Sequence, residues 1–252
     1  MNTSKEAKLA NTHRQATRPM TFSRKVALAA GVLYLITFVS IPTLSLYSPV
    51  LNDPNYIAGP GPDTAVIIGG ILEIIVALAG IGTAVALFPV VKRQNEGVAL
   101  GFIGSRILEA ATIFAGVVSL LTVVTLRQAG AGVNGLVTGQ ALVALYNWFH
   151  LGQNLMPCVN ALLLGTLLYQ ARLVPRILPL LGFIGAPLLI ANTIVTMFGI
   201  SGPLYLLTGI GVLPIAVWEF SLGVWLTVKG FKPSAIISEY AKMETNELLS
   251  AT

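Results

Sequence analysis

Five ionisable side chains interrupt segments of the sequence that are otherwise apolar. They are Glu73, Arg106, Glu109, His150 and Glu219. Arg106 and Glu109 are three residues apart, a spacing at which opposite charges meet on one face of a helix. The two remaining carboxyls, Glu73 and Glu219, then have only the imidazole of His150 as a basic group to balance them. Because burial disfavours the charged form of a carboxyl, we expect one of these two to be protonated or neutralised by a bound cation.

Asparagine residues lie in the same segments, whereas metal-binding residue types are scarce. Asn154 and Asn192 join the five ionisable residues as candidates for a ligand- or proton-binding site, and Asn147 and Asn160 accompany them. The sequence has one Cys, two His and no HExxH pattern, which argues against a disulfide framework and against a zinc centre. We therefore predict no metal site and no cofactor, and we assign no catalytic residue.

Helical spacing indicates which way these polar residues face. Steps of three and four residues from each of them reach small residues, and small residues mark the face on which membrane helices pack closely. At about 1.5 Å per residue, Glu73 and His150 fall on the outer side of the bilayer centre and Arg106 on the inner side. The sequence therefore predicts one polar cavity in the middle third of the membrane. The small residues concerned include Ala77, Gly80, Thr112, Gly116, Cys158, Ala161, Gly185, Ala216 and Gly223.

The composition indicates what kind of elements carry these residues. Of the 252 residues, 55% are hydrophobic and only 10% are charged, and the mean hydropathy is +0.80. Soluble domains carry about 25% charged residues. We predict an all-α, polytopic membrane protein with a compact bundle of six transmembrane helices at 26–45, 65–90, 98–125, 143–169, 177–198 and 206–228. The predicted organisation is a disordered basic tail at 1–23, a transmembrane domain at 24–230 and a polar tail at 231–252.

The basic residues lie almost entirely on one side of the predicted bundle. Of the 15 Lys and Arg residues, 13 belong to the two tails and to the connectors after the second and fourth spans. Only Arg127 lies on the opposite side. By the positive-inside rule both termini are cytoplasmic. We attribute the net charge of +5 to this asymmetry and predict membrane lipids, not nucleic acid, as partners.

The connector at 47–64 is the longest one between spans and is rich in Pro and Gly. Asp63 or Thr64 is placed to N-cap the second span. We interpret the connector as a structured turn, and a lid over an outward-facing cavity is the alternative. Pro157 and Pro214 lie where they can kink the fourth and sixth spans. No pair of interrupted helices is visible in the sequence.

Several of these residues belong to a recurring pattern. It comprises 24–38, Asp53-Pro54-x-Tyr56, Glu73, 87–96, Arg106-Ile107-Leu108-Glu109, His150 and Trp218-Glu219. In this pattern the chain resembles a bacterial family of six-span membrane proteins classed only as a domain of unknown function. The resemblance covers roughly 24–229. It implies a bacterial cytoplasmic membrane and the importance of these positions, and it implies no reaction.

Three classes of function are consistent with the sequence. The leading hypothesis is binding or translocation of a small molecule that is cationic or proton-coupled, because the buried carboxyls outnumber the buried basic groups. The second is an intramembrane enzyme that acts on a lipid or isoprenoid through Glu and His acid–base chemistry. The third is a structural accessory or sensor subunit, which an exposed patch of small residues without a cavity would favour.

Overall fold

The computed structural model describes residues 20–199 and 205–232, with the side chains of 205–210 left out. Most of the two predicted tails lies outside these residues. All elements in the described residues are helical, and six helices are long and apolar enough to cross a membrane. The predicted fold class, an all-α bundle of six membrane-spanning helices, is therefore confirmed.

The six crossings differ in length and in continuity. The first consists of α2 (Phe22–Ile36), the 3₁₀ turn η1 (Thr37–Ser40) and α3 (Thr43–Leu46). The others are α5 (Asp63–Val91), α6 (Glu96–Gln128), α7 (Leu136–Gln170), α8 (Ile177–Met197) and α9 (Tyr205–Val228). Short elements α4 (Ser48–Asn52), η2 (Tyr56–Ala58) and η3 (Gly132–Gly135) lie in the connectors.

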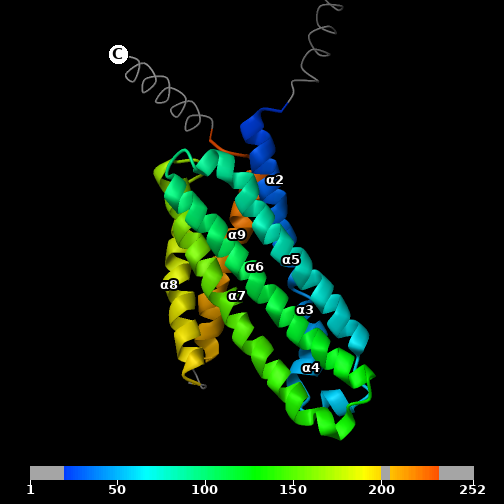
Figure 1. Ribbon diagram of the computed structural model, residues 1–252. Helices are drawn as coiled ribbons and strands as arrows, with labels where there is room; N and C mark the ends of the chain where they lie inside the picture. The colour runs from blue at the N-terminus through cyan, green and yellow to red at the C-terminus, as the bar shows by residue number, and fades with distance from the viewer. Residues whose placement is uncertain (1–19, 200–204, 233–252) are drawn as a thin grey trace, which may run out of the picture.

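The long helices form a closed ring. Each packs mainly against its neighbours in sequence, and α2 packs against α9, so the order around the ring is α2, α5, α6, α7, α8, α9 (Figure 1). With 21 residues against 35 in α7, α8 is about 20 Å the shorter helix at 1.5 Å per residue. The lower end in Figure 1, which we call the outer end, is built from α5, α6, α7 and the short elements α3, α4 and η2.

Contact between α2 and α9 closes the ring. A Cβ atom added to Gly31 would lie 2.4 Å from Thr227 Oγ1 and 2.8 Å from the carbonyl oxygen of Gly223, so only glycine permits this approach. Arg24 donates hydrogen bonds to the carbonyls of Leu226 (2.9 Å) and Thr227 (2.6 Å). A cation is favourable at a helix C-terminus, where carbonyls lack partners within the helix. The start of α2 is thereby fixed to the end of α9.

The opposite end, which we call the inner end, is filled by the largest apolar cluster. It draws on all six crossings, and Trp218, Tyr34 and Phe102 are completely buried in it. The ring of Tyr34 meets the ring of Trp218 edge to face at 6.5 Å. This packing leaves the inner third of the ring closed by side chains.

The connector between the first two crossings is a structured turn attached to the bundle. Arg127 of α6 donates to both carboxylate oxygens of Asp63 and to the carbonyl of Gly59. Tyr56 also donates to Asp63, and burial, followed by this carboxylate, raises the pKa of Tyr56 to about 12. The predicted N-cap is wrong, because α5 begins at Asp63 with Pro62 as its N-cap residue and without a side-chain cap. The carboxylate binds the arginine instead.

The first crossing is interrupted inside the membrane, although its composition indicates one continuous segment. The α-helix ends at Ile36, and Pro42, which has no N–H to donate, precedes α3. Irregular backbone at this depth is tolerated where it lines a cavity or is buried in protein. Three hydroxyls, one turn apart, each donate to the carbonyl three residues earlier and so satisfy it; they belong to Thr37, Ser40 and Thr43.

Candidate functional site

Two adjoining cavities lie inside the ring. The inner cavity, of about 230 Å³, is lined by Arg106, Glu109, Asn154 and Glu219 among others. The outer cavity, of about 480 Å³, is lined by Glu73, Tyr47, Tyr146, Asn147 and His150 among others. The two cavities share three lining residues, Ser40, Ile41 and Gln153, and therefore meet at the interruption of the first crossing.

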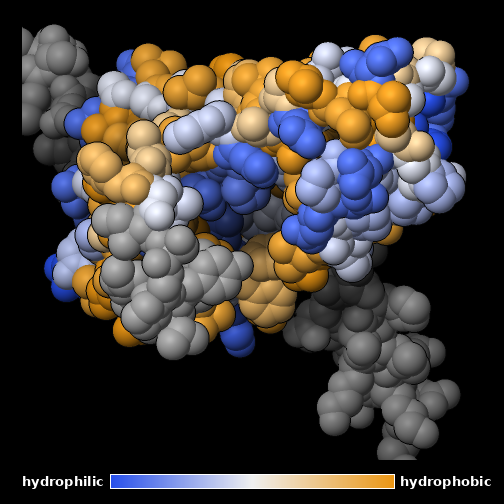
Figure 2. Space-filling model, turned by 90° about the horizontal axis from the view of Figure 1, so that it is seen from below, coloured by the Kyte–Doolittle hydropathy of each residue, from blue (hydrophilic) through white to orange (hydrophobic). Residues whose placement is uncertain are grey.

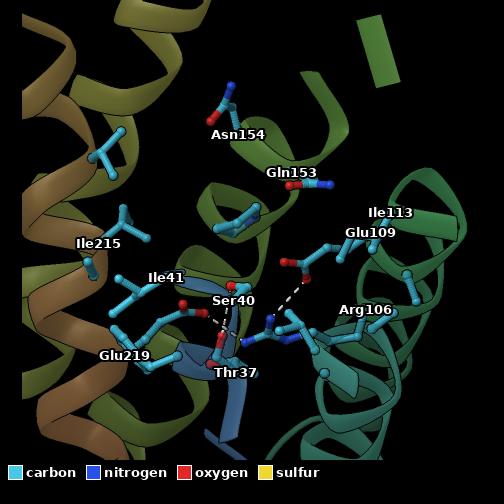
Figure 3. A pocket seen from close by; sticks show the side chains of 18 of the residues that line it. Thr37, Ser40, Ile41, Arg106, Glu109, Ile113, Gln153, Asn154, Ile215 and Glu219 are labelled. Carbon is cyan, nitrogen blue, oxygen red and sulfur yellow. Dashed lines mark hydrogen bonds and ion pairs between the residues drawn. The ribbon is translucent and has the colours of Figure 1, made fainter. Parts of the chain in front are cut away.

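Arg106 is the central charge of the inner cavity. It projects from α6 and is 3% exposed, and its guanidinium donates to Glu109 Oε2 at 2.9 Å and to Glu219 Oε1 at 2.8 Å (Figure 3). Its Cζ atom lies 5.2 Å from the centre of the Tyr34 ring and 5.8 Å from that of Phe102. The arginine thus joins α6 to α9 and rests on the aromatic side chains that close the inner end.

Glu109 has a second, neutral partner. Asn160, a completely buried residue of α7, donates from its amide nitrogen to Glu109 Oε2 at 2.8 Å. Ser105 donates in turn to the Asn160 side-chain oxygen. Glu109 Oε2 therefore accepts one charge-assisted and one neutral hydrogen bond. With both carboxylates ionised, the group of Arg106, Glu109 and Glu219 carries one negative charge.

Glu73 dominates the outer cavity. Its side chain is 5% exposed, and Tyr146 donates to its Oε1 at 3.5 Å, a long hydrogen bond. Tyr47 and Gln153 also approach this carboxyl. Burial, followed by the nearby Glu73 carboxylate, raises the pKa of Tyr47, so its phenol stays protonated. Within the described residues no basic side chain forms an ion pair with Glu73.

Two glycines make room for the tyrosines around Glu73. A Cβ atom added to Gly69 of α5 would lie 2.4 Å from Tyr47 Cε1. One added to Gly116 of α6 would lie 3.2 Å from Tyr146 Cδ2. The two phenol rings therefore sit in depressions on neighbouring helices, and both depressions face the same carboxyl.

The structure brings six of the seven candidate residues to the two cavities. Glu73 and His150 line the outer one, and Arg106, Glu109, Asn154 and Glu219 line the inner one. Asn192 lies on α8 against Gly211 of α9 and lines neither. The expected single cavity is thus two connected chambers.

Several polar residues of these cavities are not among the seven sequence candidates, and Tyr47, Tyr146 and Gln153 are the three that lie around Glu73. Tyr146 and Gln153 lie four residues before and three residues after His150, so the steps that oriented His150 also reach them. Tyr47 lies beyond the first crossing, in the connector, where helical spacing gives no orientation. A tyrosine in an apolar segment is usually interpreted as a core packing residue, so sequence analysis does not single out its hydroxyl as part of a site.

A recess leads toward these cavities from the outer end. Viewed from that end, the surface is hollowed near its middle, and hydrophilic side chains lie in the depth of the hollow (Figure 2). Asn147 and His150 are exposed on the outer half of α7. The described state is therefore open toward the outer end and closed by the apolar cluster at the inner end.

In the part of the chain that is described, the acidic, His and Cys side chains around the cavities are spread out and not grouped. Within the described residues, no group of three or more His, Cys, Asp and Glu side chains is placed to hold a metal. Glu73 and His150 line one cavity, yet no hydrogen bond joins them in the part of the chain that is described, and the His150 ring lies beside that of Tyr146 at 6.1 Å. Direct acid–base pairing between them is absent from this state.

Comparison with known proteins identifies a family. Residues 29–230 match the family described as Domain of unknown function (DUF4386). No curated protein matches the chain, and no solved structure does. The matched region contains both cavities, all six crossings except the start of α2, and the seven candidate residues. The chain belongs to this family.

Proposed function

We propose that this member of the DUF4386 family binds a small molecule in the two connected cavities and carries it across the membrane. The observation that carries the proposal is Arg106, held between Glu109 and Glu219 on the wall of a cavity. Charges inside the hydrocarbon region are costly and are retained mostly where they serve binding or transport. A cavity beside them provides space for a ligand.

Charge balance favours a cationic or proton-coupled ligand. The inner cavity has two carboxylates for one guanidinium, and Glu73 adds a third carboxyl in the outer cavity. None of the described residues that line the outer cavity is Lys or Arg. A cation or a proton that enters from the recess relieves the excess negative charge, whereas an anion increases it.

The interruption of the first crossing supports translocation. Interrupted helices beside a binding site are common in secondary transporters. Thr37, Ser40 and Ile41 of this segment line the inner cavity (Figure 3). The apolar cluster of Tyr34, Phe102 and Trp218 then acts as the inner gate in the described state.

We place the protein in a bacterial cytoplasmic membrane with both termini inside. The support is the distribution of Lys and Arg, of which 13 of 15 lie in the tails and in the two connectors at the inner end. The recess then opens to the outside of the cell. A transporter in this state can accept a ligand from outside.

Access to the inner cavity from both sides tests the proposal without knowledge of the ligand. Ala216 of α9 lines the inner cavity, and its neighbour Val217 is 43% exposed on the outer surface of the ring. We compare Ala216→Cys with Val217→Cys, both in a Cys158→Ala background. A transporter that alternates between states exposes the Ala216→Cys thiol to a charged methanethiosulfonate reagent in right-side-out and in inside-out vesicles.

The matched variant defines the background. The Val217→Cys thiol faces lipid and should remain unlabelled in both vesicle preparations, because a thiol in hydrocarbon does not ionise. If Ala216→Cys reacts from the outer side alone, the cavity is a blind pocket and translocation is refuted.

An intramembrane enzyme is the second candidate. The observation in its favour is that Glu73 and His150, a carboxyl and an imidazole, line one cavity. Their acid–base chemistry would require the Tyr146 ring to move or to relay a proton between them. One-sided labelling of Ala216→Cys favours this function over transport.

A further inference from the structure

The outer cavity contains buried polar atoms that lack hydrogen-bond partners. Glu73 Oε2, the Tyr47 hydroxyl and Gln153 Nε2 are shielded from solvent and lie near one another, yet none of the three makes a hydrogen bond of normal geometry within the described residues. Glu73 is 5% exposed and Tyr47 is 2% exposed. A buried polar atom without a partner costs free energy, so native proteins seldom retain one without a ligand or water beside it. These three side chains line the same space.

Glu73 is the only acidic residue that lines this cavity, and no Lys or Arg in the described chain lines it. Arg106, the guanidinium of the inner cavity, is already held by two other carboxylates. An ionised Glu73 is therefore left without a positive partner inside the membrane. A ligand with a single positive charge supplies that partner.

Aromatic rings form the walls beside this carboxyl. The rings of Tyr47 and Tyr146 meet at 83° with their centres 5.7 Å apart, and the His150 ring lies 6.1 Å from that of Tyr146. The two rings meet edge to face, and both line the cavity, where the electron-rich face of an aromatic ring attracts a cation. Gly69 and Gly116 hold these two rings in place, because a larger residue at either position would displace a tyrosine ring.

The set of groups discriminates between kinds of cation. A hard metal ion requires six or more oxygen ligands, and this cavity offers one carboxylate. Organic ammonium ions need one counter-charge, aromatic faces and apolar surface for their alkyl groups. Ile41, Leu44 and Leu51 supply that apolar surface. The volume of about 480 Å³ exceeds the about 150 Å³ that accepts a benzene molecule.

We propose that the outer cavity is a binding site for an organic ammonium ion, with Glu73 as its counter-ion and the rings of Tyr47 and Tyr146 as its aromatic walls. This inference rests on the proposed function, because it names the class of ligand that binds in the outer of the two proposed cavities. Free amines and the ammonium head groups of lipids share this chemistry.

Binding of choline tests the proposal. The protein is reconstituted in nanodiscs of phosphatidylglycerol, a lipid without an ammonium group, and its melting temperature is measured against choline chloride. The neutral isostere 3,3-dimethylbutan-1-ol has the same shape without the charge and serves as the ligand control. We expect saturable stabilisation by choline and none by the alcohol.

Variants identify the site of binding. Glu73→Gln should weaken choline binding at least tenfold, and Glu96→Gln, which alters an exposed carboxyl at the inner end, should leave it unchanged. Tyr146→Phe keeps the ring and removes the hydroxyl, so it should retain binding within about threefold, whereas Tyr146→Leu should lose it. If Glu73→Gln does not fold, the comparison of Tyr146→Phe with Tyr146→Leu still shows whether choline binding depends on the aromatic ring.

The outcomes separate this proposal from translocation and identify the source of the ligand. If nanodiscs with added phosphatidylcholine lose the response to choline, a lipid head group occupies the same site, and the proposal is supported. Equal responses to choline and the alcohol, or full binding by Glu73→Gln or Tyr146→Leu, overturn it. Two-sided labelling of Ala216→Cys without choline binding refutes the ligand class alone, and choline binding with one-sided labelling refutes translocation alone.

Discussion

Arg106 is stabilised by partners from two distant parts of the chain. Its charge is compensated by Glu109, one helical turn away, and by Glu219, which lies 113 residues further along. Neither carboxylate has another basic partner in the described structure. Removal of the guanidinium therefore leaves two charges uncompensated at once, which is more damaging than the loss of an isolated pair.

Stepwise removal of these charges tests that dependence. We expect Arg106→Ala to destabilise the protein by about 3–5 kcal/mol. Adding Glu109→Gln to Arg106→Ala should restore part of the lost stability, because it removes a carboxylate that has no partner. Adding Glu219→Gln as a third change should restore more for the same reason. Melting temperature in nanodiscs provides the measurement. The exposed Lys25→Ala is the control, and a triple variant no more stable than Arg106→Ala would show that the carboxylates have other partners.

The candidate site could be predicted in part at the scale of residues. Charged groups such as Glu73 and Arg106 stand out in apolar segments because their burial is costly, and small residues on the same helical face indicate the interior. The partnership of Arg106 with Glu219 depends on where α6 and α9 lie across the ring from each other, which no local spacing encodes. Likewise, Asn160 is recognisable as a polar residue, but its bond to Glu109 depends on packing between α6 and α7.

The first crossing shows what apolar composition fails to predict at the scale of elements. By length and mean hydropathy, the 25 residues from Phe22 to Leu46 count as one membrane span. Pro42 and the hydroxyls at Thr37, Ser40 and Thr43 are the signals of the break, because they remove a backbone donor and satisfy carbonyls locally. Proline within a membrane helix is nevertheless common, and Pro157 and Pro214 lie in helices that continue past them.

Two glycines allow a matched test of helix packing. Gly31→Ala would place a methyl group 2.6 Å from the backbone nitrogen of Thr227, and we expect a loss of about 1–3 kcal/mol from overpacking between α2 and α9. Gly104→Ala, on the surface of α6, would meet no atom within 4 Å and should be neutral or stabilise by about 0.5–1 kcal/mol. Thermal unfolding in nanodiscs gives both values. Equal effects would mean that α2 and α9 are not closely packed.

At the scale of the whole molecule, the six crossings are predictable and their arrangement is not. Each crossing carries its own apolar signal, whereas the closure of the ring depends on Gly31, Gly223 and Arg24, whose partners lie about 200 residues away. The unequal lengths of α7 and α8 also escape prediction, because the first turns of α7 are polar enough to read as a connector. These features create the recess, so the shape of the site follows from tertiary contacts.

The orientation of the molecule determines which side the recess serves. All described connectors at the inner end carry Lys or Arg, whereas among the described residues of the outer end Arg127 is the only Lys or Arg, and it is paired with Asp63. Since flanking basic residues are retained in the cytoplasm, the recess should open to the outside. The start of α2 and the end of α9 lie together at the inner end. One measurement at the inner end and one at the outer end are therefore enough to determine the orientation.

Cysteine labelling in intact cells decides the orientation. Asn55 and Gln94 are exposed, the first in the outer connector and the second between α5 and α6 at the inner end. In a Cys158→Ala background, a membrane-impermeant maleimide should label Asn55→Cys in intact cells and Gln94→Cys only after the cells are broken. The buried Cys158 itself should remain unlabelled in the parent. The reverse pattern would place the recess in the cytoplasm, and the ligand would then be one that the cell exports.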